Sequence, residues 1–445
     1  MTKTQAHVDT SLQQAQIEVV DTCRELLRYD TTNVGGADGA WERAAAERVA
    51  EWLTDLGLTP TLLESERGRA NVIARIDGHD RNRPALLVHG HLDVVPVAGQ
   101  VWTLPPFAGE IADGCLWGRG AVDMKDFLAM VLAVLGHWRR AGIIPSRDIV
   151  VAFLADEEAG SRLGSAWLVD HHRELFAGCD EAISEVGGFS WTTPTGRRLY
   201  LVETAQKGIA WRKVRARGTS GHGSMPGPDN PVTAIAAAVA RVGGYRWPVK
   251  RIDTVREFVA AASDALGAEI DLDDRAGLER QLGSLSRLVI PALSHTVSPT
   301  AISAGAGSVN QVPGVAEAVF DGRYLPGLYD DFAATFNELV GPGLEVEDLY
   351  TEAALQHPFG APLVDAMTSA LIAEDPHAVT VPYCMPAGTD NTSFARLGIR
   401  GYGFVPLQLP PAFDFAAMFH GPDERVPLSA LRFGTRVLSR FLQHC

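Results

Sequence analysis

LVHGHLDVVP (residues 87–96) places two histidines and an aspartate, His89, His91 and Asp93, at alternate positions at the end of an apolar run. Alternate side chains of a strand point to the same face of its sheet. The preceding ALLVHG (85–90) is almost wholly apolar, as in a strand buried on both faces of a parallel sheet. The stretch therefore predicts a strand ending at the carboxyl edge of an α/β sheet, where functional groups gather. Its polar residues are either metal ligands or ordinary side chains where a strand leaves the core.

Other apolar runs alternate with helical patterns around this strand. ANVIARI (70–76) and IVVAFLA (149–155) indicate strands, and DFLAMVLAVLGHWRRAG (126–142) indicates a long apolar helix. Two amphipathic helices are predicted around IEVVDTCRELLRY (17–29) and AWERAAAERVAEWLTDLG (40–57). The pattern predicts an α/β fold with a parallel sheet covered by helices on both faces.

From about Lys207 the pattern changes to a β-α-β-α-β series about 150 residues long, typical of a small α+β domain. We therefore predict a catalytic domain in two parts, residues 1–206 and 354–445, with an inserted domain at 207–353. Within the insert, residues 250–300 are predicted to add further helix.

Composition limits the class of protein. The chain has 445 residues, of which 46% are hydrophobic and 21% charged, so it is expected to be globular with more than one domain. A net charge of -15 argues against binding nucleic acid or an anionic membrane, and favours small molecules or short peptides as partners. The sequence shows no signal-peptide pattern and no 18-residue apolar run, so we expect a cytoplasmic protein. Its five scattered cysteines suit reduced thiols.

Acidic residues follow two further predicted strands. Glu157 and Glu158 come after IVVAFLAD, and Glu185 comes after DEAIS. Two adjacent carboxylates repel each other unless a cation holds one and the other takes up protons, so the pair suits one metal ligand and one general base. The alternative is a solvated acidic turn.

Asp123 and His420 complete the inventory of candidate ligands. Asp123 lies in WGRGAVDMKD just before the long helix, where it is either a ligand or an N-cap. A dinucleotide loop is rejected there because the third glycine is missing and Asp123 would repel phosphate. His420 lies in FHGPDERVP near the C-terminus and is unremarkable when considered alone.

Together these residues form a mixed nitrogen and oxygen set without thiolates. Such a set suits zinc, with cobalt or manganese also acceptable. Carboxylate-rich sites with an aspartate that can be shared hold two metals in many hydrolases. A serine hydrolase and a zincin are poorly supported, because the chain contains neither GxSxG nor HExxH.

The motifs HGHLDVVP, WGRGAVDMK, ADEEAGS and FHGPDE, in this order, closely resemble those of the M20 family of metallopeptidases and amidohydrolases. That family includes carboxypeptidases, aminoacylases and desuccinylases. The resemblance implies a di-zinc exopeptidase-type α/β catalytic domain with an inserted α+β lid or dimerisation domain.

The resemblance also assigns the metal ligands. His91 and Glu185 would hold one of two divalent ions, most simply Zn²⁺. Glu158 and His420 would hold the other, and Asp123 would bridge the two.

Further roles follow from the same resemblance. Asp93 would hydrogen-bond the far ring nitrogen of His91 and so fix its tautomer. Glu157 would be the general base that takes a proton from the metal-activated water and later gives it to the leaving amine. A cis peptide bond is expected after Asp123, and His89 is expected to be a packed neighbour.

The remaining site residues match shorter motifs. His222 in TSGHGSMP would reach an active site, often that of a partner subunit, and stabilise the oxyanion, which implies a possible homodimer through the lid. Substrate contacts would come from Asn310 in NQVPG, Arg323 in DGRYLP, and Gly388 and Thr389 in AGTDN. The planar guanidinium of Arg323 suits a carboxylate, although a surface ion pair is the alternative.

The predicted function is therefore metal-dependent hydrolysis of an amide bond in short peptides or N-acyl amino acids that carry a free carboxylate. A dipeptidase or carboxypeptidase and an aminoacylase are both compatible with these motifs. A non-catalytic metal-binding scaffold is the alternative from another class.

Overall fold

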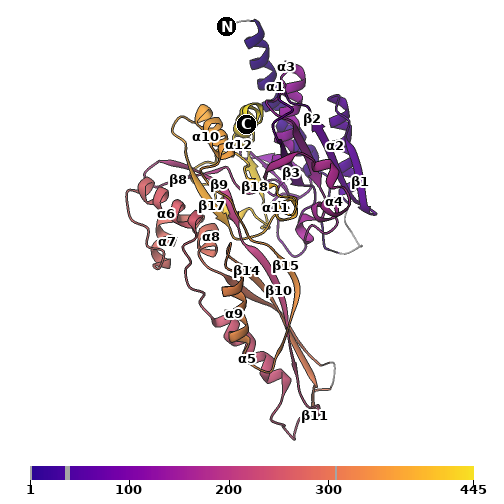
Figure 1. The fold of residues 1–445 in the computed structure, drawn as a ribbon, viewed down its shortest axis with the longest axis vertical. Helices are drawn as coiled ribbons and strands as arrows, with labels where there is room; N and C mark the ends of the chain where they lie inside the picture. Colours follow the sequence, from indigo (N-terminus) through magenta and orange to yellow (C-terminus); the bar gives the residue numbers. More distant parts are fainter. Residues whose placement is uncertain (1–2, 36–40, 306–307) are drawn as a thin grey trace.

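The computed structural model describes residues 3–35, 41–305 and 308–445. They form a body around a ten-stranded sheet and an arm around a four-stranded sheet that projects from it (Figure 1). The strands of the large sheet are β1 (Thr61–Glu66), β2 (Arg69–Ile76), β3 (Ala85–His91), β6 (Ile149–Leu154), β7 (Cys179–Ser184), β8 (Phe189–Thr192), β9 (Arg198–Gln206), β16 (Leu355–Gln356), β17 (Val379–Met385) and β18 (Arg400–Gly403).

The large sheet is mixed. Its main order is β1-β2-β6-β3-β7-β18-β9-β16, with β17 and β8 paired to β9. The pairs β6–β3, β3–β7 and β7–β18 are parallel, whereas β1, β2 and β16 pair antiparallel to their neighbours. The predicted α/β fold is confirmed. The predicted parallel pairing holds for the centre of the sheet, which hairpins and short strands extend with antiparallel pairs.

Successive side chains of the central strands enter two different cores. Leu86 and Val88 of β3 join the core under one set of helices, and Leu87 joins the core on the opposite face. The first set contains α1 (Lys3–Leu27), α3 (Lys125–Ala141), α10 (Pro362–Glu374) and α12 (Leu428–His444). The second face is covered by α4 (Ser165–His171), the 3₁₀ turn η2 (Arg173–Phe176) and α11 (Asn391–Ala395). This double burial explains why the predicted strands are continuously apolar.

Two smaller elements complete the body. Helix α2 (Glu42–Asp55) packs against β2 and ends before Gly57, which has a φ of 82° that suits glycine. A three-stranded sheet in the order β19-β5-β4 joins distant parts of the chain; its strands are β4 (Glu110–Ala112), β5 (Cys115–Trp117) and β19 (Arg425–Pro427).

The four-stranded sheet of the arm and its two helices contain the predicted alternation of strands and helices, with one strand, β12, in addition. Its sheet has the order β12-β14-β10-β15 and is covered by α5 (Pro231–Gly244) and α9 (Tyr329–Val340). The strands are β10 (Gly208–Arg217), β12 (Thr296–Ala304), β14 (Val315–Tyr324) and β15 (Glu345–Glu352), with β11 (Gly221–His222) and β13 (Gln311–Val312) paired at the tip. Strand β12 was not predicted, because it is largely exposed and Pro299 interrupts its pairing.

The helices within residues 250–300 were expected to belong to the inserted domain, but they pack on the large sheet of the body. They are α6 (Asp253–Leu266), α7 (Arg275–Leu282) and α8 (Ser286–Val289), with the 3₁₀ turns η3 (Gly283–Leu285) and η4 (Ile290–Leu293). Val255 and Phe258 of α6 are buried in the same core as Val381 of β17. These helices therefore cover the large sheet and do not extend the arm (Figure 1). We propose that residues 207–353 form the inserted domain in the sequence, but that the helical segment within them packs with the body and not with the arm.

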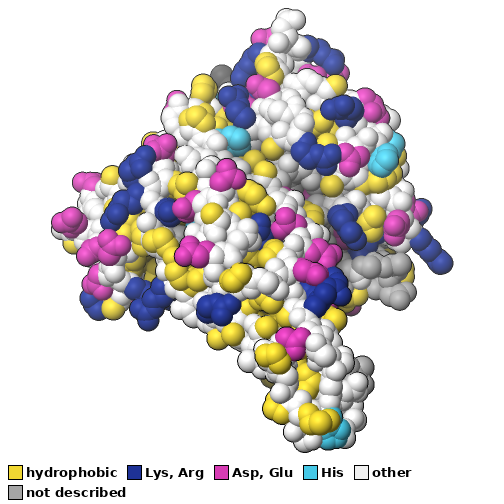
Figure 2. All heavy atoms as spheres, turned by 60° about the horizontal axis from the view of Figure 1, so that its bottom comes forward, with side chains coloured by type: hydrophobic (Ala, Val, Ile, Leu, Met, Phe, Trp, Pro, Cys, Tyr) yellow, Lys and Arg dark blue, Asp and Glu magenta, His cyan; other side chains and the backbone are white. Residues whose placement is uncertain are grey.

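The surface of the arm is partly apolar. Figure 2 shows it as a protrusion with hydrophobic side chains along its surface. Met225, Ile302 and Leu349 are among its exposed hydrophobic residues. Among the helices of the described residues, none is both long and apolar enough to cross a membrane.

Candidate metal centre

The carboxyl ends of β6, β3 and β7 meet at one edge of the large sheet, because these neighbouring strands are parallel. His91 is the last residue of β3, and Glu185 directly follows β7. Glu157 and Glu158 follow β6 in the 3₁₀ turn η1 (Glu157–Ala159). The sheet therefore gathers an imidazole and three carboxylates from three separate segments.

His91 lies at the middle of this group. Its Nε2 is 3.1 Å from Oδ1 of Asp123, 3.4 Å from Oε2 of Glu185 and 4.0 Å from Oε2 of Glu157. Its Nδ1 donates to the backbone carbonyl of Asp93 over 2.9 Å. Because a carbonyl oxygen only accepts, Nδ1 carries a proton, which leaves Nε2 as the nitrogen that would bind a metal.

His420 reaches the same group from the C-terminal part of the chain. Its Nε2 is 3.3 Å from Oδ2 of Asp123 and 3.2 Å from Oε2 of Glu158. The carboxylate of Asp123 therefore lies between the two imidazoles, with one oxygen toward each. The expected cis peptide bond between Asp123 and Met124 is present.

Glu424 holds the loop that carries Asp123. Its buried carboxylate accepts hydrogen bonds from the backbone N–H groups of Gly120, Val122 and Asp123, at 3.0, 2.8 and 3.2 Å. Nη1 of Arg119 donates to it over 2.6 Å, and Nη2 of Arg119 donates to the backbone carbonyl of His420 over 3.3 Å. The Arg119–Glu424 pair thus joins the loops of two candidate ligands.

Asp93 differs from its expected role. Its carboxylate is 3.6 Å from Nδ1 of His91, beyond hydrogen-bond range, and the backbone oxygen of Asp93 makes that contact instead. The carboxylate accepts from the backbone amides of Glu157 and Glu158, at 3.1 and 3.0 Å, and from Nδ2 of Asn33 at 2.8 Å. Asp93 therefore fixes the turn that carries the two glutamates.

His89 is a packed neighbour, as predicted. It is buried against Phe394, and its Nε2 is 2.9 Å from Oδ1 of Asn391. Burial lowers the pKa of His89 to about 4, so the ring is neutral. It points to the face of the sheet opposite to the core of α1 and α3.

The centre contains more carboxylates than positively charged partners. In the described parts of the chain, Asp123, Glu157, Glu158 and Glu185 form ion pairs with His91 and His420 and with no lysine or arginine. Burial and the nearby Asp123 raise the pKa of Glu158 to about 7. Burial likewise raises the pKa of Glu185 to about 7, and burial and repulsion from Glu185 raise the pKa of Glu157 well above its usual range.

The carboxylates around the two imidazoles raise the pKa values of both rings, which favours their charged forms. Hydrogen bonds to Asp123 and Glu158 raise the pKa of His420 to about 10. Burial opposes charge on His91, but Glu185 and Asp123 still raise the pKa of His91 well above its usual value. Hydrogen bonds from the same imidazoles outweigh burial and lower the pKa of Asp123.

The donor set fits divalent cations. Donor atoms of His91, Asp123 and Glu158 lie within 4.8 Å of one another, as do those of His91, Glu157 and Glu185. Oε1 of Glu158 is buried with no hydrogen-bond partner among the described residues. A bound cation would stabilise this arrangement, because it would offset the repulsion between the buried carboxylates and would contact the unsatisfied oxygen.

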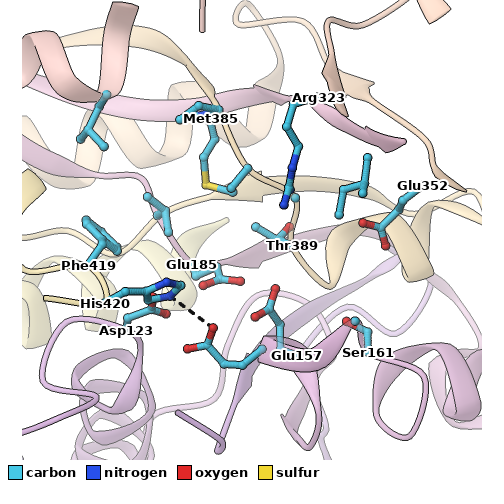
Figure 3. A pocket seen from close by; sticks show the side chains of 18 of the residues that line it. Asp123, Glu157, Ser161, Glu185, Arg323, Glu352, Met385, Thr389, Phe419 and His420 are labelled. Atoms are coloured by element: carbon cyan, nitrogen blue, oxygen red, sulfur yellow. Dashed lines mark ion pairs between the residues drawn. The ribbon is translucent and has the colours of Figure 1, made fainter. Parts of the chain in front are cut away.

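A pocket of about 360 Å³ opens onto this centre (Figure 3). Asp123, Glu157, Glu158, Glu185 and His420 lie along it, and Arg323 of the arm points into it from the other side. Gly388 and Thr389 also line it, as their motif suggested. Nε and Nη2 of Arg323 donate to Asp321 over 2.7 and 3.1 Å, which holds the guanidinium in place.

Two predicted residues do not line this pocket. His222 lies in β11 at the tip of the arm, exposed, with Nδ1 2.8 Å from Oγ of Ser224. Asn310 lies beside it, and its carbonyl accepts from the backbone N–H of Gly223 over 2.6 Å. The chain therefore places these two residues together, away from its own metal centre.

Other pocket residues were not found from the sequence. Trp211, Leu288, Glu352, Met385 and Phe419 line the cavity. Most are ordinary apolar residues from elements far apart in the chain. Phe419 and Met385 carry a weak signal, because one precedes His420 and the other ends an apolar strand.

Comparison with known proteins finds similarity to a family of peptidases. The model of the peptidase family M20/M25/M40 matches residues 87–444. The chain is 26% identical over 378 residues to the probable carboxypeptidase S-like 2 of Dictyostelium discoideum, covering 79% of this chain and 70% of that protein. It is 25% identical over 406 residues to the N-fatty-acyl-amino acid synthase/hydrolase PM20D1 of Bos taurus, covering 85% and 77%.

The fold is also known from solved structures. The M20 family metallo-carboxypeptidase Sso-CP2 from Sulfolobus solfataricus superposes with a TM-score of 0.71 at 20% identity, over 96% of this chain and 98% of that one. The chain belongs to the peptidase family M20/M25/M40 and is a hydrolase of peptide or amide bonds.

Proposed function

We propose that this protein hydrolyses the amide bond of short peptides or N-acyl amino acids that carry a free carboxylate, with two divalent metal ions. The observation that carries the proposal is the convergence of two imidazoles with the buried carboxylates of Asp123, Glu158 and Glu185, with Glu157 beside them in the lining of a pocket.

The contacts support a division of the ligands into two sets. His91 and Glu185, 3.4 Å apart, would hold one ion. Glu158 and His420, 3.2 Å apart, would hold the other, and Asp123 would contribute one oxygen to each. Zinc suits this donor set best, with cobalt or manganese as substitutes. Such ions polarise a carbonyl and lower the pKa of water.

Glu157 would be the general base. Its carboxylate lines the pocket, and the amide of its own backbone is held by Asp93. Burial and Glu185 raise the pKa of Glu157, so this group can hold a proton between its removal from water and its delivery to the leaving amine.

Arg323 would bind the carboxylate of the substrate. Asp321 already fixes two of its nitrogens, which leaves Nη1 without a hydrogen-bond partner among the described residues. A guanidinium held in this way loses little freedom when it binds a carboxylate. Gly388 and Thr389 would contact the substrate nearby.

His222 and Asn310 would act on another copy of the chain. They lie at the tip of the arm, outside the pocket of their own chain, and the arm exposes apolar side chains such as Met225 and Ile302. A homodimer joined through the arm would cover this surface and bring His222 to the partner's pocket, where it could stabilise an oxyanion.

The two relatives compared above are a probable carboxypeptidase and an N-fatty-acyl-amino acid synthase/hydrolase, which favours both classes of substrate. Purified protein loaded with zinc or cobalt should be tested against dipeptides and N-acyl amino acids, with and without a chelator. We expect cleavage of at least one class, lost on chelation and restored by the metal. Activity that survives complete metal removal, or none toward either class, would refute the proposal.

A further inference from the structure

Helix α8 brings the helical segment 253–293 to the reaction pocket. The segment packs on the large sheet through α6, and α8 lies against β17. Leu285 and Val289 are buried in the core on either side of Leu288, which is only partly buried and lines the pocket. The segment is therefore anchored by its neighbours while Leu288 remains available to a ligand.

Leu288 lies in the same pocket as the apolar side chains of Met385 and Phe419, and the candidate metal ligands line that pocket too. Met385 ends β17, and Phe419 directly precedes His420. Figure 3 shows Met385 and Phe419 on the side of the pocket where His420 lies, and Glu352 and Ser161 on the opposite side. The His420 side of the pocket therefore carries two apolar side chains beside the reacting groups, and the opposite side carries the polar Glu352 together with the apolar Ile209.

The helical segment is also tied to the loop that carries His420. Turn η3 packs against the 3₁₀ turn η5 (Phe415–Ala417). Arg287, next to Leu288, forms an ion pair with Asp414, whose carboxylate caps η5 by accepting from the backbone N–H of Ala417 over 3.2 Å. Leu288 and Phe419 are therefore positioned together, although about 130 residues separate them in the chain.

We propose that Leu288, with Met385 and Phe419, selects substrates that carry an apolar group next to the scissile amide. This inference rests on the proposed amide hydrolysis. An aliphatic or aromatic group seated there would remove water from all three side chains, whereas a small group would leave them hydrated. The flexible Met385 can adapt to groups of different shape. The apolar group can belong to the acyl part or to the amino-acid side chain, and the test separates these sources.

The test compares kcat/KM for N-acetylglycine, N-octanoylglycine and N-acetyl-leucine in the zinc-loaded wild type and in Leu288→Gln. Wild type is expected to favour at least one of the two apolar substrates over N-acetylglycine. Leu288→Gln should reduce that preference about tenfold, because the loss falls on contacts with the apolar group. The substrate whose preference falls identifies which part of the substrate meets Leu288.

Ile372→Gln is the control, because Ile372 is 43% exposed on α10, outside the arm, and does not line the pocket. It should leave all three values unchanged, and both variants should keep the metal content and melting temperature of wild type. A wild type without preference for an apolar group, or an unchanged preference in Leu288→Gln, overturns this inference alone. Failure to cleave any amide substrate overturns the proposed function as well.

Discussion

The carboxylate of Asp93 accepts a hydrogen bond from the backbone amide of Glu158 over 3.0 Å. It also accepts from the amide of Glu157 and from Asn33, so three donors converge on one side chain. Burial by itself raises the pKa of Asp93, but the nearby His91 and the hydrogen bonds from Asn33 and the amide of Glu158 outweigh burial and lower the pKa, so the group stays ionised. Asp93 thus sets the position of the proposed base and of a proposed ligand.

Asp93→Asn should damage the centre although it changes little in size. An amide has one oxygen and cannot accept from all three donors, and its NH₂ group would face an N–H. We expect metal affinity or turnover to fall by about 10–100-fold. Metal titration and kcat/KM measure this effect.

Asp30→Asn is the control for that substitution. Asp30 also accepts from a backbone amide, that of Thr32 at 3.1 Å, but it lies on the surface outside the pocket. It should leave metal affinity and turnover unchanged. Equal effects of the two substitutions would show that the hydrogen bonds of Asp93 have no special role.

Glu424→Ala should strongly destabilise the protein. Glu424 and Arg119 are both buried, and the substitution leaves the guanidinium unpaired and three backbone N–H groups without their acceptor. Breaking a buried pair in this way costs about 3–5 kcal/mol. Urea denaturation gives the free energy of unfolding, and Glu424→Gln should recover part of it because it keeps one acceptor oxygen.

The control is Asp77→Ala, which breaks the exposed pair between Asp77 and Arg81. Exposed pairs contribute at most about 1 kcal/mol. The explanation for Glu424 would be wrong if the two alanine variants lost similar stability.

The sequence predicts the centre better than the pocket around it. His91, Glu158 and Glu185 were found because the ends of apolar strands must meet at one edge of a parallel sheet. The role of Glu424 was missed because its partners are mainly backbone amides, which leave no pattern in side chains. Leu288 was missed because an ordinary leucine becomes informative only when tertiary packing brings α8 to the pocket.

Arg323→Lys tests the proposed recognition of the carboxylate. A lysine lacks the planar fork that Asp321 holds, so it should bind a carboxylate less well. KM for a substrate with a free carboxylate should rise about tenfold, with a smaller change in kcat. The carboxamide form of the same substrate should be nearly unaffected. Equal losses for both forms would rule out this role.

Glu203→Gln should change how stability depends on pH. Glu203 is 2% exposed, and burial raises its pKa to about 8, with repulsion from Glu185 adding to the rise. The unfolded chain releases this proton near pH 4.5, whereas the folded chain keeps it up to about pH 8. Stability therefore falls as pH rises through this window, by at most about 1.4 kcal/mol per pH unit.

Melting temperatures of metal-free wild type and Glu203→Gln at pH 6 and pH 8 measure this effect. The variant lacks the ionisable group, so its stability relative to wild type should increase from pH 6 to pH 8. A difference that stays constant between the two pH values would contradict the explanation.

Glu157→Gln, measured for both turnover and bound metal, tests the proposed mechanism most directly. Glu157 also lies close enough to His91 and Glu185 to be a ligand, so the two readouts separate the roles. If Glu157 is the general base, its replacement should lower kcat by at least about 100-fold, while the metal content stays near two ions per chain. Retained turnover, or loss of one ion from each chain, would contradict the assignment of Glu157 as the base.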